Sequence, residues 1–133
     1  MTTRAADQTA LAIVDRYFRE VVTGAGPALA EDLIGNEVLR QRTAALRAAF
    51  PDLSLAIHQL IGDDDLVAVH AMASGTHLGT FHGVPATGRH WNASYTAILR
   101  IAEGRIADFW ENWDLLGILE QLGAVRRVQG VSA

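Results

Sequence analysis

The residue types of this 133-residue chain restrict the chemistry that it can perform. It has no cysteine, and all 11 basic residues are arginine, so a thiolate nucleophile and a lysine Schiff base are both excluded. His77 and His82 have the four-residue spacing of a helical metal pair, but Gly79 and Gly83 predict irregular backbone there. No nucleophile-elbow serine or phosphate-binding glycine motif occurs. We therefore predict no metal site, and the carboxylates, tyrosines and histidines remain for proton transfer.

One predicted surface in the C-terminal half gathers aromatic side chains around a single carboxylate. A three-residue turn at 102–104, with its glycine in the left-handed position, would join the last two strands. This register sets Tyr95 opposite Glu111. It also sets Ala97 opposite Phe109. Because cross-strand partners share a face, the expected surface consists of Trp91, Ala93, Tyr95, Ala97, Phe109, Glu111 and Trp113. A two-residue turn would reverse the parity and remove Glu111 from this surface.

Helices are predicted in the first third of the chain. Apolar residues recur at intervals of three and four between 7 and 22, which indicates an amphipathic helix. A short helix is expected at 27–34, with proline in its first turn. Asn36 can cap a third helix, which ends at Phe50 because the next residue is a proline.

The hydrophobic period then changes to that of strands. The expected strands span 53–61, 66–74, 89–101 and 105–113. A glycine-rich connection fills 75–88, and Asp114 caps a last short helix that ends near 122. Helices followed by antiparallel strands predict an α+β fold, with the helices on one face of a curved sheet. The length of residues 1–133 suits one domain.

Composition and charge narrow the class of partner. The formal net charge of −4 argues against nucleic acid, since phosphate binding needs a basic face. No stretch reaches the ~18 apolar residues that a membrane span needs, and no apolar run near Met1 suits a signal peptide. We therefore expect a soluble, cytoplasmic protein.

Several short blocks occur in a fixed order. They are Phe-Pro-Asp-Leu at 50–53, Gly-Thr-His-Leu-Gly at 75–79, Phe-His-Gly-Val-Pro at 81–85, Arg-Ile-Ala-Glu-Gly-Arg-Ile at 100–106 and Trp-Glu-Asn-Trp-Asp at 110–114. The ordered set resembles the SnoaL-like polyketide cyclase family, within the nuclear-transport-factor-two-like cone fold. That resemblance implies a cone-shaped α+β barrel around a hydrophobic pocket. It also implies ring closure by an intramolecular aldol step, with a pocket carboxylate and no cofactor.

The resemblance also assigns residues. The acid/base position of the family falls on Glu111, and the nearby family histidine is replaced by Ala97. Tyr95 could then donate a hydrogen bond to an enolate oxygen, or simply pack as an aromatic ring. His82 is a second proton-transfer candidate, and His77 is expected to anchor the loop by a hydrogen bond. The alternative for Glu111 is a salt bridge to an arginine at the surface or at an interface.

Further residues are expected to bind the substrate or a partner. The substrate-binding candidates are Phe18, Trp91, Phe109 and Trp113. Trp110 falls on the opposite parity, on the outer sheet face that often forms a dimer interface in this fold, so a homodimer is expected. The link at 33–37 is shorter than is usual in the family, so one pocket wall is expected to be shorter or more open.

Three functions are compatible with these features. The first is a cofactor-independent cyclase of a polyketide-like or related secondary-metabolite intermediate, acting on a hydrophobic small molecule. The second is a hydroxylase or hydrolase of a related substrate, which the missing histidine favours. The third is a non-catalytic domain that binds a ligand or dimerises, because an aromatic pocket with one carboxylate also suits simple binding.

Overall fold

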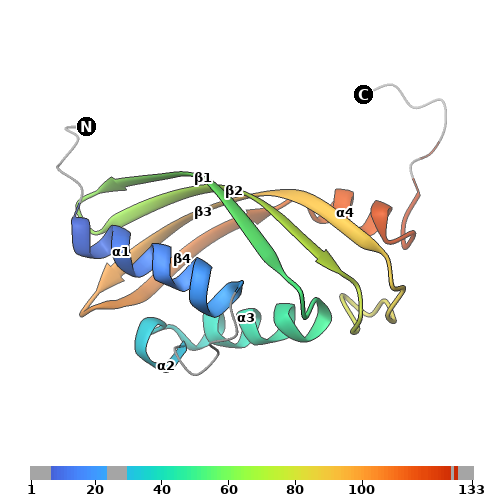
Figure 1. Ribbon diagram of the computed structural model, residues 1–133, viewed down its shortest axis with the longest axis horizontal. Helices are drawn as coiled ribbons and strands as arrows, with labels where there is room; N and C mark the ends of the chain where they lie inside the picture. The colour runs from blue at the N-terminus through green and yellow to red at the C-terminus, as the bar shows by residue number, and fades with distance from the viewer. Residues whose placement is uncertain (1–6, 24–29, 127, 129–133) are drawn as a thin grey trace.

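The computed structural model describes residues 7–23, 30–126 and 128. Its elements are α1 (Gln8–Arg16), the π-helical η1 (Tyr17–Val22), α2 (Ala30–Leu33), α3 (Glu37–Ala49), β1 (Ser54–Asp63), β2 (Leu66–Thr76), β3 (His90–Ala102), β4 (Arg105–Trp113) and α4 (Leu115–Gln121). The strands form one antiparallel sheet in the order β1-β2-β3-β4. Figure 1 shows the sheet arching over α1 and α3, which lie on its concave side. The predicted α+β fold is confirmed.

The helices begin at capping side chains, of which Asn36 was predicted. The Asp7 carboxylate accepts from the backbone N–H of Thr9 at 2.9 Å, and α1 continues into η1 up to Val22. The Asn36 side chain accepts from the N–H of Leu39 at 3.1 Å and so caps α3. Of the helix expected at 27–34, α2 is observed, whereas 27–29 lie outside the described residues. None of the described helices combines the length and the apolar character that crossing a bilayer requires.

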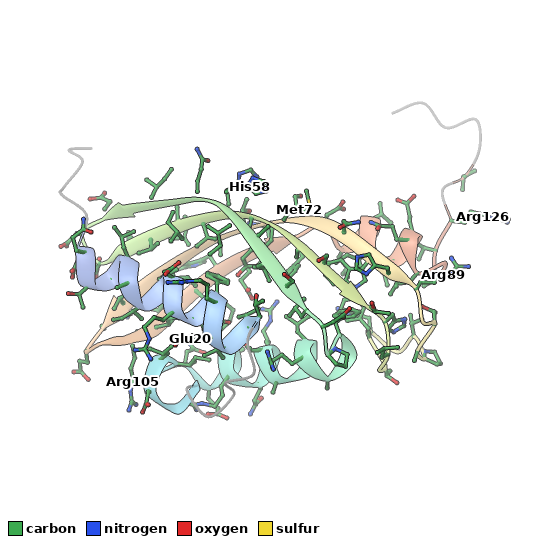
Figure 2. All side chains as sticks on the ribbon, viewed as in Figure 1. Glu20, His58, Met72, Arg89, Arg105 and Arg126 are labelled. Atoms are coloured by element: carbon green, nitrogen blue, oxygen red, sulfur yellow. The ribbon has the colours of Figure 1, made fainter. Side chains whose placement is uncertain are left out.

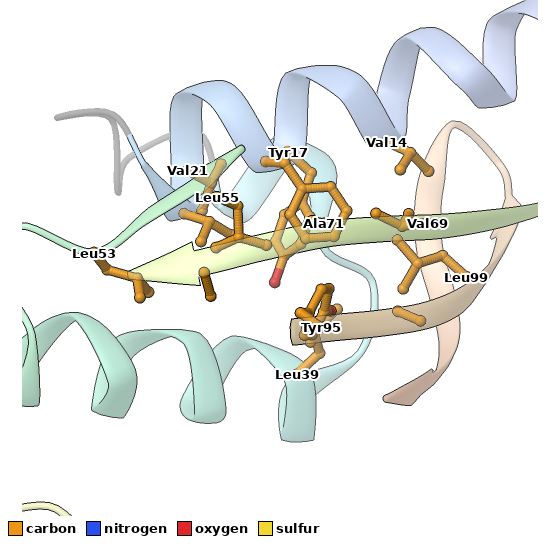
Figure 3. Close-up of a cluster of buried hydrophobic side chains, with 14 of the residues drawn as sticks. Val14, Tyr17, Val21, Leu39, Leu53, Leu55, Val69, Ala71, Tyr95 and Leu99 are labelled. Carbon is orange, nitrogen blue, oxygen red and sulfur yellow. The ribbon is translucent and has the colours of Figure 1, made fainter. Parts of the chain in front are cut away.

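The core lies between the concave face of the sheet and the helices. Residues 90–99 of β3 alternate between exposed and buried, as a strand with one covered face should. Figure 3 shows Val14, Tyr17 and Val21 from the first helical segment packed over Val69 and Ala71 of β2. Each large apolar side chain buried in this way contributes about 1.5–3 kcal/mol.

The hairpin between β3 and β4 corrects the predicted register. The turn has two residues, Glu103 and Gly104, both with positive φ, and Ala102 rather than Ile101 pairs with Arg105. Such a turn alone would reverse the parity of β4. However, the register shifts beyond Ile101, because Ala107 is an extra residue on β4 and forms a bulge.

The bulge restores the predicted face with different partners. Glu111 lies opposite Ala97, not Tyr95, and Tyr95 lies opposite Trp113. Phe109 lies opposite Leu99, not Ala97. The prediction that Glu111 shares the concave face was therefore right, although both the turn and the cross-strand pairs were wrong.

The short link before α3 covers the outer edge of β4. Ile34 forms a parallel bridge with Ile106 and is fully buried, and Gly35 N donates to the Ile106 carbonyl at 2.9 Å. The Asn36 amide then donates to the carbonyl of Ala107 at 3.0 Å. The link thus binds the sheet at the bulge and covers that edge of β4.

Candidate active site

The centre of the candidate site is the Glu111 carboxylate. Its side chain is only 5 % exposed, and its Oε2 accepts a 2.6 Å hydrogen bond from the Oη of Tyr95. Its other oxygen, Oε1, lies 3.6 Å from the Nη2 of Arg42 on α3. A buried carboxylate needs such partners, since removing its charge from water is otherwise costly. Glu111 therefore does pair with an arginine, but its carboxylate is buried rather than at the surface.

Arg42 is positioned by α3 at the edge of this cluster. Its side chain is 51 % exposed, and its guanidinium carbon lies 5.5 Å from the ring centroid of Phe109. The ring therefore supports the cation from one side while Glu111 attracts it. Sequence reasoning missed Arg42, although it follows the buried Leu39 by three residues and precedes Leu46 by four, so that all three share one helical face.

Two buried tyrosines extend the polar cluster. Burial raises the pKa of the Tyr95 phenol well above its ordinary value, and the negative charge of Glu111 raises it further. Burial likewise raises the pKa of Tyr17, whose Oη lies 2.8 Å from the Oγ1 of Thr43. Both phenols therefore remain protonated near neutral pH, and Tyr95 acts as a donor to Glu111. Tyr17 and Thr43 were not predicted as site residues.

An apolar cavity of about 450 Å³ adjoins the cluster. Its walls come from α3, the loop after β2, the concave sheet face and α4. It is lined by Arg42, Ala45, Leu46, Phe50, Thr80, Phe81, His82, Trp91, Trp113, Leu115 and Ile118. Trp91 is fully buried and forms the inner wall, whereas Arg42 and His82 are solvent-exposed at the rim. We call this cavity the aromatic pocket.

The structure brings together some of the predicted site residues and separates others. Trp91 and Trp113 line the aromatic pocket, and the Trp113 ring is tilted against that of Tyr95 with 4.4 Å between ring centroids. The other three predicted residues of this face do not line the pocket but contact residues that do. Glu111 and Phe109 contact Arg42, and Tyr95 contacts Trp113. Phe18 lies in the core, with its ring 5.8 Å from that of Tyr95.

The histidines have separate roles. His82 is at the pocket rim in a tight turn with positive φ, and its ring packs on Phe81 rather than on Glu111. His77 is buried, and its Nδ1 contacts the Oγ1 of Thr87 at 2.9 Å, which confirms the predicted loop anchor. Among the described residues, no group of three or more His, Asp or Glu side chains is arranged to hold a metal ion.

A second hollow lies on the outer, convex face of the sheet. It measures about 330 Å³, and Ile61, Ala68, Ile98 and Trp110 form a cross-strand row along it. Trp110 is 55 % exposed, as the sequence predicted for the outer face. In Figure 2, Met72 and His58 project from this side of the sheet, away from the helices.

Comparison with known proteins gives one consistent family. The family model described as "SnoaL-like polyketide cyclase" matches residues 1–122. A 49-residue stretch is 41 % identical to the aklanonic acid methyl ester cyclase DnrD of Streptomyces peucetius. That stretch covers 37 % of this chain and 34 % of the relative, so the chain matches about a third of the curated protein's length.

Solved structures agree on the fold. TsrD from Streptomyces laurentii superposes with a TM-score of 0.78 at 23 % identity, covering 91 % of this chain and all of that one. A SnoaL-like polyketide cyclase from Agrobacterium tumefaciens superposes with a TM-score of 0.66 at 19 % identity, covering 92 % of this chain and all of that one. At these identities the likeness establishes the shared architecture alone.

Proposed function

The chain belongs to the SnoaL-like polyketide cyclase family, and we propose that it closes a ring in a polyketide-like intermediate without a cofactor. One observation carries the proposal: a 5 % exposed carboxylate, Glu111, is held by Tyr95 and Arg42 beside an apolar pocket. The partial relative from Streptomyces peucetius is named aklanonic acid methyl ester cyclase, which agrees with such a reaction. We include in the proposal that residues 1–133 act as one domain in the cytoplasm, where a biosynthetic intermediate would be made.

The proposed reaction is an intramolecular aldol addition. Glu111 removes a proton from a carbon next to a carbonyl group, and the resulting enolate attacks a second carbonyl carbon of the same molecule. A carbon–carbon bond forms, and the new alkoxide takes the proton back from Glu111, so atoms and charge balance without any oxidant. In this proposal Arg42, the cation paired with Glu111, stabilises the developing negative charge, and the pocket walls hold the chain folded.

Arg42 also controls access in this proposal. It lines the aromatic pocket, whereas Glu111 lies behind it. A ligand therefore reaches Glu111 only after the half-exposed Arg42 side chain moves aside or turns its charge toward the ligand. Its Glu111 contact is a 3.6 Å ion pair rather than a short hydrogen bond, which favours such a movement.

The missing family histidine is accommodated by two other groups. Ala97, the position at which the resemblance leads one to expect histidine, lies directly opposite Glu111 in the sheet. Tyr95 supplies the hydrogen bond that orients the carboxylate, and Arg42 supplies the positive charge.

The test is Glu111→Gln, which keeps the shape of the side chain and removes its basicity. With a polyketide-type substrate, turnover should fall by ~10²-fold or more, because a positioned acid/base contributes 10²–10⁴-fold. Asp108→Asn is the matched control. Asp108 lies on the same strand and pairs with Arg100, but it belongs to the opposite face of the sheet from Glu111. Full turnover by Glu111→Gln would refute the proposal.

A binding-only role is the second candidate, and the position of Glu111 behind Arg42 favours it. In that case the wild-type protein returns a bound ligand unchanged. Hydroxylation or hydrolysis would instead introduce oxygen from isotope-labelled dioxygen or water into the product, which ring closure does not.

We further propose a homodimer formed through the convex sheet face. The row of Ile61, Ala68, Ile98 and Trp110 is apolar and crosses all four strands, and a second copy would cover it. Trp110→Glu should shift the mass measured by light scattering from dimer to monomer. An unchanged mass would refute this interface.

A further inference from the structure

Gln121, the last residue of α4, completes the hydrogen bonding of β3 where β4 stops. β4 pairs with β3 only from Tyr95 onward, so within the described sheet the earlier residues of β3 have no strand on that side. The Gln121 side chain takes this place at Asn92. Its Oε1 accepts from the Asn92 N–H at 2.9 Å, and its Nε2 donates to the Asn92 carbonyl at 2.7 Å. One amide therefore covers the open edge of the strand as a neighbouring strand would.

α4 also closes the inner end of the aromatic pocket. Ile118 precedes Gln121 by three residues, so both lie on one side of the helix. Ile118 lines the pocket together with Phe50 and Trp91, and these three residues are at most 2 % exposed. Solvent reaches the rim of the pocket but not this end. A ligand can therefore contact Trp91 only when one of the surrounding walls moves.

α4 is a lightly held wall. It has seven residues, of which only Ile118 is buried. Two further hydrogen bonds of this segment are long, since the Asp114 N–H donates to the Ser94 carbonyl at 3.4 Å and Arg89 donates to the Gln121 carbonyl at 3.4 Å. A short helix with little buried surface opens locally at a low cost in free energy. Much of its attachment to β3 therefore depends on the Gln121 side-chain amide.

We propose that Gln121 is a latch: its amide pair with Asn92 holds α4 against β3, and breaking the pair opens the inner end of the aromatic pocket to a ligand. The chain turns at Asp114, between β4 and α4, and Ile118 leaves the pocket wall together with the rest of the helix. Gln121 is a positioning residue, since it does not line the pocket itself. The latch rests on the proposed function only in requiring that the aromatic pocket binds a ligand.

Thiol labelling measures the opening, because the chain has no cysteine of its own. Ile118→Cys places one thiol at the closed inner end, and the aromatic disulfide 5,5′-dithiobis(2-nitrobenzoate) must enter the pocket to react with it. Adding Gln121→Leu removes both bonds to Asn92 and should speed labelling by about 25-fold, at about fivefold for each neutral hydrogen bond. Ala71→Cys, at a buried position of β2, is the matched control, and its labelling should rise far less. An equal rise at both positions, or no rise in Ile118→Cys, overturns the latch.

Amide hydrogen exchange tests the latch without an introduced thiol. The Asn92 N–H donates to the Gln121 side chain, so Gln121→Leu should lower the protection of this amide by a similar factor. Gln41→Leu is the matched control, because this exposed glutamine lies on α3 and bonds Glu37. It should leave the protection of Asn92 unchanged. Wild-type protection of Asn92 in Gln121→Leu would contradict the proposal.

Gln121→Glu provides a rescue that depends on pH. Near pH 7 its carboxylate can accept from the Asn92 N–H but cannot donate to the Asn92 carbonyl, so protection should fall. The protonated carboxyl group carries one donor and one acceptor, as the amide does, and protection relative to the wild type at the same pH should return. Because the Arg89 cation lies beside this position, the acid measurement is made at about pH 3.5, below the ordinary glutamic acid value of about 4.3. Continued loss of protection there overturns the two-bond latch. Turnover by Glu111→Gln tests the reaction separately, so either proposal can fail while the other stands.

Discussion

The Asn36 amide donates a 3.0 Å hydrogen bond to the carbonyl oxygen of Ala107, the extra residue in the β4 bulge. The two residues are 71 positions apart in the chain. Their contact matters because the bulge decides which face of the sheet Glu111 occupies. The same Asn36 caps α3, the helix that carries Arg42, so one side chain connects both halves of the Glu111–Arg42 pair.

Substitutions at Asn36 should separate these two roles. Asn36→Asp keeps the oxygen that caps α3 but loses the donor to Ala107, so the free energy of unfolding should fall by about 1 kcal/mol. Asn36→Ala loses the cap as well and should cost about 2 kcal/mol in total. Urea denaturation measures both, and amide exchange should increase around Ala107 in both variants. Wild-type stability of Asn36→Asp would show that the bond does not hold the bulge.

Arg42→Gln should reveal how strongly the cation supports Glu111. It leaves a carboxylate that is 5 % exposed without its positive partner, and because Arg42 itself is half-exposed we expect a loss of only about 1 kcal/mol in stability. In a Glu111→Gln background the same change should cost clearly less, and this difference is the coupling between the two residues. Additive losses in the double variant would contradict the pairing.

Phe109→Leu is the control for that cycle. It removes the ring beneath the guanidinium while keeping the charge of Arg42. The Arg42–Glu111 coupling should therefore persist in Phe109→Leu. Its disappearance would mean that the ring, rather than the ion pair, positions Arg42.

The two tyrosines should resist alkaline titration. Tyr17 and Tyr95 are the only tyrosines in the sequence, and burial raises the pKa of both above the ordinary value of about 10. Their stabilising contribution is complete below about pH 10 and is lost as the pH rises toward the folded-state values. Phenolate absorbance should therefore remain absent near pH 10 and appear together with unfolding. In denaturant, both phenols should titrate normally.

Single variants assign that transition. Tyr95→Phe and Tyr17→Phe should each remove half of the late phenolate signal. A tyrosine that ionises near pH 10 in the folded protein would contradict its burial. Tyr95→Phe should also lower turnover without a matching change in KM, because it loses the 2.6 Å bond that orients Glu111.

The elements of this fold could be predicted from local patterns, but the contacts between them could not. Asn36 and Asp114 mark helix starts because their side chains bond the first backbone N–H groups. The alternation on β3 likewise predicts its buried face. By contrast, nothing local marks Ala107 as a bulge, because its partner Asn36 is distant in sequence.

The candidate site shows the same division. Strand parity, which is a local property, predicts that Trp91, Trp113 and Glu111 share one face of the sheet. Arg42 was missed because a polar residue on an amphipathic helix is most simply assigned to solvent, and only the packing of α3 against β4 brings it to Glu111.

Asp52 should account for part of the stability lost in acid. Two hydrogen bonds from Thr76 lower the pKa of the Asp52 carboxyl group. The backbone N–H has the larger effect and the hydroxyl the smaller one, and each lies 2.7 Å from a carboxylate oxygen. Its stabilising effect is therefore complete above the unfolded-state value of about 3.9 and is lost as the pH falls through the lowered folded value. Asp52→Asn should lower the melting temperature at neutral pH, but not at a pH low enough to protonate Asp52 in the folded protein. Thr76→Val removes only the hydroxyl donor and should reproduce the smaller part of the difference. A melting-temperature difference that is constant with pH would show that the Asp52 charge does not contribute.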